Sequence, residues 1–414
     1  MADNNYTNVM NYIHPFHSWG MPISHAEGIY LFDNLGNKWT DITSSASVVN
    51  IGYDDVRVKD VIRGQLDKLI FASPTAQTQE ADTLAEKLIQ LLPVGLDTIL
   101  RSTTGSEAVE VALKLARKYT HRSKFLSFRH SYHGHTMGAM AIGMHEGTKK
   151  DFLPLIDSDI IHHPYIVRGS KGYEEAKAES LSQIESRLST GEYAAFVTEY
   201  LMSSPGSFPL DVGFMQALRK LCDEYGTLLV VDEVLTGFGR TGKMFAFEYS
   251  GVTPDIITLA KGLGSGYSPI AATVTSKAIA EGFDYFATFA WNPLACVVAS
   301  RVLDIYEEDN LVQNSHDIGE LIVKQLHAGL DDNSHVADIR GLGLKLAIEI
   351  DDNKSFNEIM ERLRKEYIYV GAADLPNIIH IAPPLIITEQ QATELTKTII
   401  DVINNKDIQS KDSA

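Results

Sequence analysis

The fold is decided by Leu228-Leu229-Val230-Val231-Asp232-Glu233, together with Ile256-Ile257-Thr258-Leu259-Ala260-Lys261 further along the chain. Each stretch begins as a short apolar run, ends on a charged residue and leads into a glycine-rich loop. Such runs are typical of strands buried on both faces of a sheet. Ligands of open α/β sheets bind beyond the carboxyl ends of the strands. We therefore expect Asp232 and Lys261 at a binding site.

The flanking sequence alternates between strand and helix patterns. Further strands are predicted at Thr98–Arg101, Phe125–Phe128, Ala194–Thr198 and Ile270–Val274, and amphipathic helices at Ser106–Tyr119, Phe214–Tyr225 and Asn292–Tyr306. This alternation predicts an α/β fold in which helices cover both faces of a mostly parallel sheet.

The pattern changes after a helical stretch over residues 292–329. Short strands at Leu344–Ile350 and Ile378–Ile381 and helices at Asn357–Lys365 and Glu389–Ile403 predict a smaller α+β unit. Strand signals at Gly28–Phe32 and Lys38–Ile42 predict that the N-terminal segment packs against it. The predicted parts are an N-terminal segment (1–70), a large α/β domain (71–310) and a small α+β domain (311–414), with residues 404–414 frayed.

Composition narrows the class of function. The 414 residues include 54 acidic and 36 basic side chains, a net charge of −18, which argues against nucleic-acid and anionic-membrane partners. Two cysteines, Cys222 and Cys296, fit a reducing compartment. Neither a signal peptide nor an apolar run of membrane-spanning length is recognisable. We therefore expect a soluble, cytoplasmic protein that acts on small molecules.

The two strand-end charges each have a functional and a structural interpretation. Burying the carboxylate of Asp232 costs free energy unless a cation pairs with it, and a protonated heterocyclic nitrogen could be that cation. A helix cap or a structural ion pair is the competing interpretation. Lysines mostly stay solvated, so Lys261 among glycines could be a desolvated nucleophile, or a lysine that reaches solvent from a turn.

Two further clusters follow strands. The segment Ser102–Ala108 predicts a hydroxyl-rich turn and a helix start, which suits a phosphate, although a capping box with Thr104 or Ser106 as cap explains the same residues. The second cluster, Arg129–Thr136, holds three histidines. We do not expect a metal there, because neither a cysteine nor a paired carboxylate lies nearby in sequence. We instead expect an aromatic residue of this cluster to stack over a flat cofactor ring.

Taken together, these motifs resemble those of the class-III pyridoxal-phosphate aminotransferases, which have the fold-type-I, aspartate-aminotransferase-like fold. The resemblance covers nearly the whole chain. It is carried by Thr104-Gly105-Ser106-Glu107-Ala108, Tyr132-His133-Gly134, Glu199, Asp232-Glu233-Val234 with Thr236–Gly242, Pro254-Asp255-Ile256 leading to Lys261-Gly262, and Thr288-Phe289 before Asn292-Pro293-Leu294-Ala295.

The resemblance implies roles for particular residues. Lys261 would hold pyridoxal 5'-phosphate as a Schiff base, and Asp232 would keep the pyridine nitrogen protonated. Thr104, Gly105 and Ser106 would hold the phosphate. Tyr132 or His133 would stack on one ring face, Val234 would pack on the other, and Glu199 would support the site. Thr288 would reach the phosphate of a neighbouring subunit, which implies a homodimer with shared active sites, although a capping hydroxyl within one chain also explains Thr288.

The implied reaction is a ping-pong transfer of an amino group from a donor to a 2-oxo acid. A racemase or epimerase on the same fold needs the same Lys261 and Asp232 and is the alternative. A non-catalytic binding protein that keeps the fold is a third interpretation, which the intact Lys261 and Asp232 argue against.

The choice of substrate rests on departures from the family pattern. Many members carry an arginine shortly before the Pro383-Pro384 pair, but this chain has His380 there and none near Ala373. His380, Arg340 or an N-terminal residue could substitute. Leu235 and the N-terminal region around Trp19 are closer to the branch that pairs amines or ω-amino acids with pyruvate. We predict that branch, with Trp19 and His380 as substrate contacts.

Overall fold

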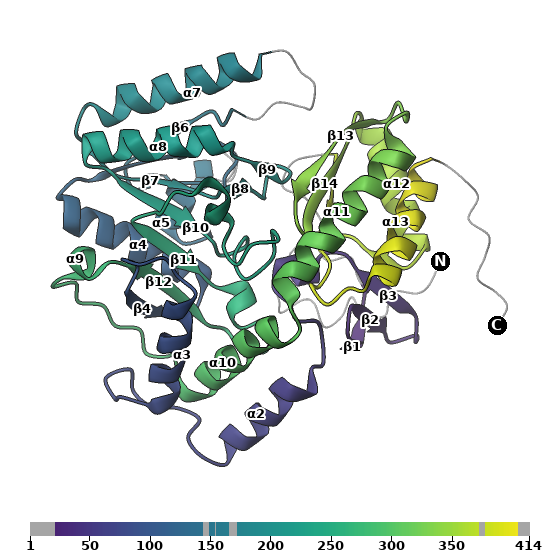
Figure 1. The fold of residues 1–414 in the computed structure, drawn as a ribbon, viewed down its shortest axis with the longest axis horizontal. Coiled ribbons are helices and arrows are strands. Elements are labelled where there is room, and N and C mark those ends of the chain that lie inside the picture. Colours follow the sequence, from purple (N-terminus) through teal and green to yellow (C-terminus); the bar gives the residue numbers. More distant parts are fainter. Residues whose placement is uncertain (1–20, 144–148, 154, 165–171, 372–376, 405–414) are drawn as a thin grey trace.

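The computed structural model describes residues 21–143, 149–153, 155–164, 172–371 and 377–404 (Figure 1). Its larger unit is built on a seven-stranded sheet with strand order β4-β12-β11-β10-β7-β5-β6. The strands are β4 (Thr98–Ser102), β5 (Lys124–Phe128), β6 (Ser158–Ile161), β7 (Tyr193–Thr198), β10 (Leu228–Asp232), β11 (Ile256–Leu259) and β12 (Ala271–Thr275). Only β12 runs opposite to the other six strands of this sheet, so the predicted α/β class with a mostly parallel sheet is confirmed.

Helices cover both faces of this sheet. They are α3 (Gln79–Gln90), α4 (Gly105–Thr120), α5 (Met137–Ala141), α7 (Tyr173–Leu188), α8 (Val212–Tyr225), α9 (Lys277–Ala280) and α10 (Pro293–Glu308). Within β10, Leu228 and Val230 join the core that includes α4, whereas Leu229 and Val231 join the core that includes α8. The run is apolar throughout because alternate side chains enter two different cores.

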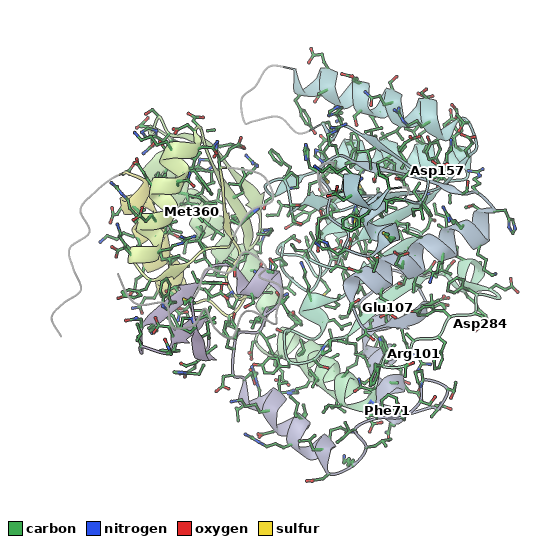
Figure 2. All side chains as sticks on the ribbon, turned by 180° about the vertical axis from the view of Figure 1, so that it is seen from behind. Phe71, Arg101, Glu107, Asp157, Asp284 and Met360 are labelled. Carbon is green, nitrogen blue, oxygen red and sulfur yellow. The ribbon has the colours of Figure 1, made fainter. Side chains whose placement is uncertain are left out.

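The smaller unit contains a three-stranded sheet of β13 (Val336–Leu342), β14 (Lys345–Ile350) and β16 (Ile378–Ile381). The helices α11 (Leu311–Leu330), α12 (Asn353–Lys365) and α13 (Glu389–Ile403) cover it. A second sheet joins β1 (Ile23–Glu27), β2 (Tyr30–Asp33) and β3 (Lys38–Asp41) to β15 (Ile368–Tyr369), so strands from both ends of the chain pair. Met360 marks the smaller unit in Figure 2.

Three details differ from the sequence-based expectations. The helical stretch over residues 292–329 is two helices, α10 and α11, because Asn310 has a φ of 50° that interrupts it. Gly28 belongs to the turn between β1 and β2, with a φ of 57°, rather than to a strand. In the N-terminal segment the strands and the stretch from Ile42 to Asn50 contact the smaller unit, whereas α2 (Val56–Leu66) packs against α10. The division at residues 70 and 310 stays a prediction.

The remaining short elements are α1 (Ser44–Ser47), β8 (Leu201–Met202) and β9 (Phe208–Pro209), with the 3-10 helices Lys150–Phe152, Ala246–Ser250 and Lys261–Leu263. In the part of the chain that the structure describes, we find no helix both long and apolar enough to cross a membrane.

Candidate active site

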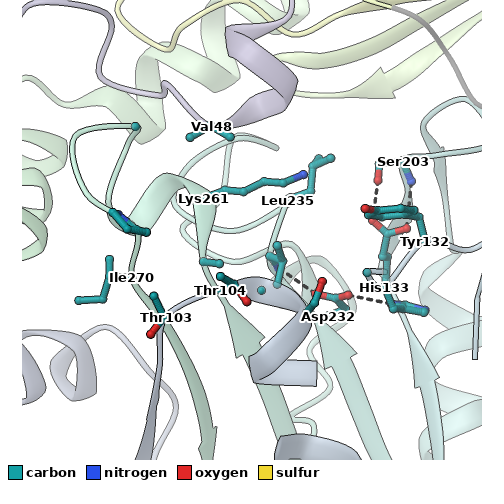
Figure 3. Close-up of a pocket in the computed structure, with 18 of the residues that line it drawn as sticks. Val48, Thr103, Thr104, Tyr132, His133, Ser203, Asp232, Leu235, Lys261 and Ile270 are labelled. Carbon is teal, nitrogen blue, oxygen red and sulfur yellow. Dashed lines mark hydrogen bonds and ion pairs between the residues drawn. The ribbon is translucent and has the colours of Figure 1, made fainter. Parts of the chain in front are cut away.

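A cavity of about 450 Å³ opens at the carboxyl ends of β10 and β11 (Figure 3). The predicted residues that line it are Thr104, Gly105, Ser106, Tyr132, His133, Glu199, Asp232, Val234 and Lys261. They come from five separate segments of the chain, and the α/β topology brings them together where ligands of such sheets bind. The cavity therefore contains nine of the twelve residues that the sequence predicts for the site.

The other three predicted residues lie elsewhere. Thr288 is exposed, and it is absent from the described lining. His380 lies on β16, where its Nδ1 is 3.3 Å from Nζ of Lys345, and it too is absent from that lining. Burial and the nearby cations Lys345 and Arg340 hold the pKa of His380 well below its usual range. Trp19 and the segment around Ala373 lie outside the described residues. The predicted roles of these three residues stay predictions.

Asp232 ends β10 with a buried carboxylate that three groups orient. Its Oδ1 accepts hydrogen bonds from the hydroxyl of Thr258 at 2.8 Å and from the backbone N–H of Val234 at 3.0 Å. Its Oδ2 lies 2.7 Å from Nδ1 of His133. The parallel pairing of β10 with β11 places Thr258 opposite Asp232. Since these contacts fix both oxygens, the carboxylate is pre-oriented at the edge of the cavity.

Glu199 is a second buried carboxyl group at the same wall. It accepts a hydrogen bond from the hydroxyl of Ser203 at 2.5 Å and a longer one, 3.3 Å, from the Ser203 backbone N–H. Burial raises the pKa of Glu199 to about 7, the neighbouring charge of His133 lowers it, and that of Asp232 raises it. Glu199, His133 and Asp232 therefore form one polar cluster.

Lys261 follows β11 and has a positive φ of 38°, a backbone conformation that non-glycine residues rarely adopt. Its carbonyl accepts hydrogen bonds from the N–H groups of Gly264 and Ser265, at 3.1 and 2.8 Å, which hold the turn. Figure 3 shows its side chain extended across the cavity toward the side that carries Tyr132 and Ser203. Strain of this kind is concentrated at functional sites.

The N-terminus of α4 has features that suit an anion. Thr104 caps the helix, since its hydroxyl accepts from the N–H of Glu107 at 3.3 Å. Only glycine fits at position 105, because a Cβ there would lie 2.8 Å from Cγ1 of Val234. Gly134 has a φ of 128°, and a Cβ would lie 2.2 Å from Oγ of Ser106. These close approaches bring the positive end of a helix dipole against the cavity, where a phosphate is stabilised.

Sequence reasoning missed several residues of the site, of which three bear directly on its geometry. Thr258 orients Asp232, Ser203 orients Glu199, and Val48 lines the cavity from the N-terminal segment. A threonine inside an otherwise apolar strand was a usable signal for Thr258. Neither Ser203 nor Val48 stands out in the sequence: Ser203 reaches Glu199 through the turn after β7, and Val48 reaches the cavity only through the tertiary fold.

The donor set fits pyridoxal phosphate. The cavity presents an amine, a helix N-terminus and a buried carboxylate, which match the aldehyde, phosphate and ring nitrogen of that molecule. Nε2 of His133 is buried and has no hydrogen-bond partner among the described residues, so the cluster around Asp232 has unused polar capacity. Tyr132, about 37% exposed, contributes an aromatic ring at the rim.

The chain is similar to known aminotransferases along nearly its whole length. An acetylornithine aminotransferase of Archaeoglobus fulgidus is 34% identical, covering 92% of this chain and 94% of that protein. An adenosylmethionine-8-amino-7-oxononanoate aminotransferase of Staphylococcus aureus is 32% identical over 95% of each chain. A solved (S)-enantioselective omega-transaminase from Thermomicrobium roseum superposes with a TM-score of 0.90 at 29% identity, covering 97% of each chain. Residues 14–403 match the family described as Aminotransferase class-III. This chain therefore belongs to the class-III aminotransferase family and is a pyridoxal-phosphate-dependent enzyme.

Proposed function

We propose that the protein transfers an amino group from a primary amine or ω-amino acid to a 2-oxo acid, preferably pyruvate, by a ping-pong mechanism. One observation carries the substrate class. Among the described residues that line the cavity, Lys261 is the only lysine or arginine, and Leu235, Pro269 and Ile270 make part of the wall apolar. A carboxylate beside the reacting carbon calls for a bidentate arginine. The described lining therefore favours a donor that lacks one, whereas the carboxylate of the 2-oxo acid acceptor must be held without an arginine from these residues.

The proposed roles follow from the contacts. Bound pyridoxal phosphate supplies an electron-withdrawing ring that stabilises negative charge on the substrate carbon. Asp232, oriented by Thr258 and His133, holds a proton on the ring nitrogen. Nζ of Lys261 attaches the cofactor and, once released, moves a proton at the substrate carbon.

The other cavity residues position the cofactor. The N-terminus of α4, with Thr104, Gly105 and Ser106, binds its phosphate. His133 is fully buried and bonds Asp232 through its ring edge, so Tyr132 is the residue proposed to stack on the cofactor ring, with Val234 on the opposite face. Glu199 supports this arrangement through its contact with Ser203.

We also propose a homodimer in which Thr288 reaches the phosphate site of the other subunit. Thr288 lies between Phe286 and Phe289, which are 58% and 65% exposed. The ring of Phe289 lies 5.4 Å from that of Phe71, and Leu66, Leu69 and Ile70 next to Phe71 are also exposed. Figure 2 places Phe71 at the end of the larger unit, near Arg101. Exposed apolar groups of this size favour coverage by a partner.

The relatives indicate a competing substrate class. Two of them are named acetylornithine aminotransferase and ornithine aminotransferase. The amino acids in those names carry a carboxylate beside an amino group. None of the relatives named here is a racemase or epimerase, so that alternative has no support. The two cysteines are buried and unpaired, which supports the proposed cytoplasmic location.

A panel of donors and acceptors tests the substrate proposal. The holoenzyme is incubated with 1-phenylethylamine, β-alanine, ornithine or N-acetylornithine, each with pyruvate or 2-oxoglutarate, and the products are quantified. We expect alanine from the first two donors with pyruvate. A preference for N-acetylornithine with 2-oxoglutarate would contradict the proposed substrates while keeping the aminotransferase chemistry.

A further inference from the structure

The small-domain sheet has one charged face, and that face meets the larger unit. In β13, β14 and β16 the side chains of Arg340, Ala347 and His380 lie in one cross-strand row, and those of Asp338 and Glu349 lie in the next. The alternate residues, such as Ile339 and Ile348, are buried in the core. Because successive side chains of a strand point to opposite faces, the charged groups share one face.

Arg340 connects this face to the larger unit. Its Nη1 lies 3.0 Å from Asp338 and 2.5 Å from Glu349, and its side chain is only 8% exposed. The Nε atom donates to the backbone oxygen of Gly206 at 2.7 Å, and the guanidinium lies 3.6 Å above the ring of Phe208. Figure 1 shows β9, which begins at Phe208, where the larger unit meets β13. The guanidinium therefore spans the two units.

Gly206 fits this contact and no larger residue does. A Cβ at Gly206 would lie 2.6 Å from Nη2 of Arg340 and 3.3 Å from Cδ1 of Ile378, and the residue has a φ of 121°. The backbone at Gly206 therefore approaches Arg340 closely only because it carries no side chain.

The same turn leads into the cavity. The N–H groups of Gly206 and Ser207 donate to the backbone oxygen of Ser203, at 3.3 and 3.4 Å. Ser203 lines the cavity and donates its hydroxyl to Glu199. A continuous set of contacts therefore joins Arg340 to a carboxyl group beside His133 and Asp232.

We propose that Arg340 is a positioning residue, which acts through Gly206 and Ser203 to hold the Glu199 side chain in the cofactor cavity. This inference rests on the proposed cofactor site but not on the proposed substrates. Lysine at position 340 would keep the charge between Asp338 and Glu349. It would lose the planar fork that serves Gly206 and Phe208 together with the carboxylates.

The test is a double-mutant cycle on cofactor binding. The dissociation constant of pyridoxal phosphate is measured by equilibrium dialysis of the holoenzyme and of its Ser203→Ala, Arg340→Lys and Ser203→Ala/Arg340→Lys variants. One hydrogen bond to a charged group corresponds to a loss of about tenfold or more, so we expect about tenfold weaker binding in each single variant. In the Ser203→Ala background, Arg340→Lys should add less than twofold.

Two further variants separate positioning from folding. Gly206→Ala should reproduce the loss without changing any charge. Arg219→Lys is the matched control, because Arg219 is 16% exposed and also pairs with two carboxylates, Asp223 and Asp255, in α8 and before β11. It should bind the cofactor like the wild type.

The visible absorbance of the bound cofactor, recorded against pH, gives a titration midpoint that a general loss of rigidity would not shift. Among the described residues that line the cavity, the titratable ones are Tyr132, His133, Glu199, Asp232 and Lys261. The midpoint should shift in the same direction in Ser203→Ala, Arg340→Lys and Gly206→Ala. Additive losses in the double variant, or wild-type binding and midpoint in Arg340→Lys, would overturn the inference alone. A wild type that binds no cofactor would overturn the site and the inference together.

Discussion

A left-handed turn beside the cavity leads to a stability prediction. Ser44, Ser45, Ala46 and Ser47 have φ values of 48°, 47°, 64° and 60°, and the next residue, Val48, lines the cavity. Oγ of Ser44 donates to the backbone oxygen of Ala382 at 2.6 Å, which ties this turn to the smaller unit. Ala46 is exposed, so its methyl group is strained without packing in return. We predict that Ala46→Gly stabilises the protein.

The magnitude follows from two opposing terms. A left-handed conformation costs an L-residue about 1–2 kcal/mol, which glycine does not incur. Glycine in turn raises the entropy of the unfolded chain, at a cost of about 0.5–1 kcal/mol. The net gain for Ala46→Gly is therefore about 0.5–1 kcal/mol.

The matched control is Ala178→Gly. Ala178 is exposed in the middle of α7, a right-handed helix of 16 residues, so the same substitution there should cost about 1 kcal/mol. Urea unfolding of both variants and the wild type should give midpoints that move in opposite directions. If Ala46→Gly lowered the midpoint as Ala178→Gly does, the strain argument would be refuted.

The remaining predictions concern one buried carboxyl group and residues of the cofactor cavity. Burial raises the pKa of Glu233 to about 7 from 4.5, so stability should fall by about 3 kcal/mol on this account as pH rises from 4.5 through 7. Glu233→Gln should remove this part of the pH dependence of the free energy of unfolding, measured by unfolding curves across this range. Parallel pH profiles of the variant and the wild type would contradict the prediction. Gly105→Ala should weaken pyridoxal phosphate binding at least tenfold in dialysis, since the new Cβ would clash with Val234; unchanged affinity would argue against the anion site. Asp232→Asn should lower kcat nearly as severely as Lys261→Ala while the cofactor still binds, and retained turnover would remove Asp232 from the proposed chemistry.

The strands of the larger sheet were predictable where both faces are buried. The runs around Val230 and Ile257 are apolar because alternate side chains enter different cores. The edge strand β6 begins with Ser158 and Asp159 and gives no such signal. The smaller sheet's β13 includes Asp338, Arg340 and Gly341, which interrupt any apolar pattern, and Arg340 bonds Gly206 of the larger unit.

The cavity was predictable in part for a similar reason. Asp232 and Lys261 stand out because a charge at the end of a buried strand needs an explanation. Ser203 carries no local signal, since its place beside Glu199 depends on a turn held by Gly206. The left-handed turn before Val48 was unpredictable, because serine and alanine do not favour positive φ.

The central claim is that Lys261 holds the cofactor in this cavity, and one measurement tests it most directly. The purified holoenzyme is reduced with borohydride, digested and mapped by mass spectrometry. We predict that the phosphopyridoxyl mass appears on the peptide that contains Lys261, with loss of the visible absorbance. The same mass on a different lysine, or on none, would contradict the claim.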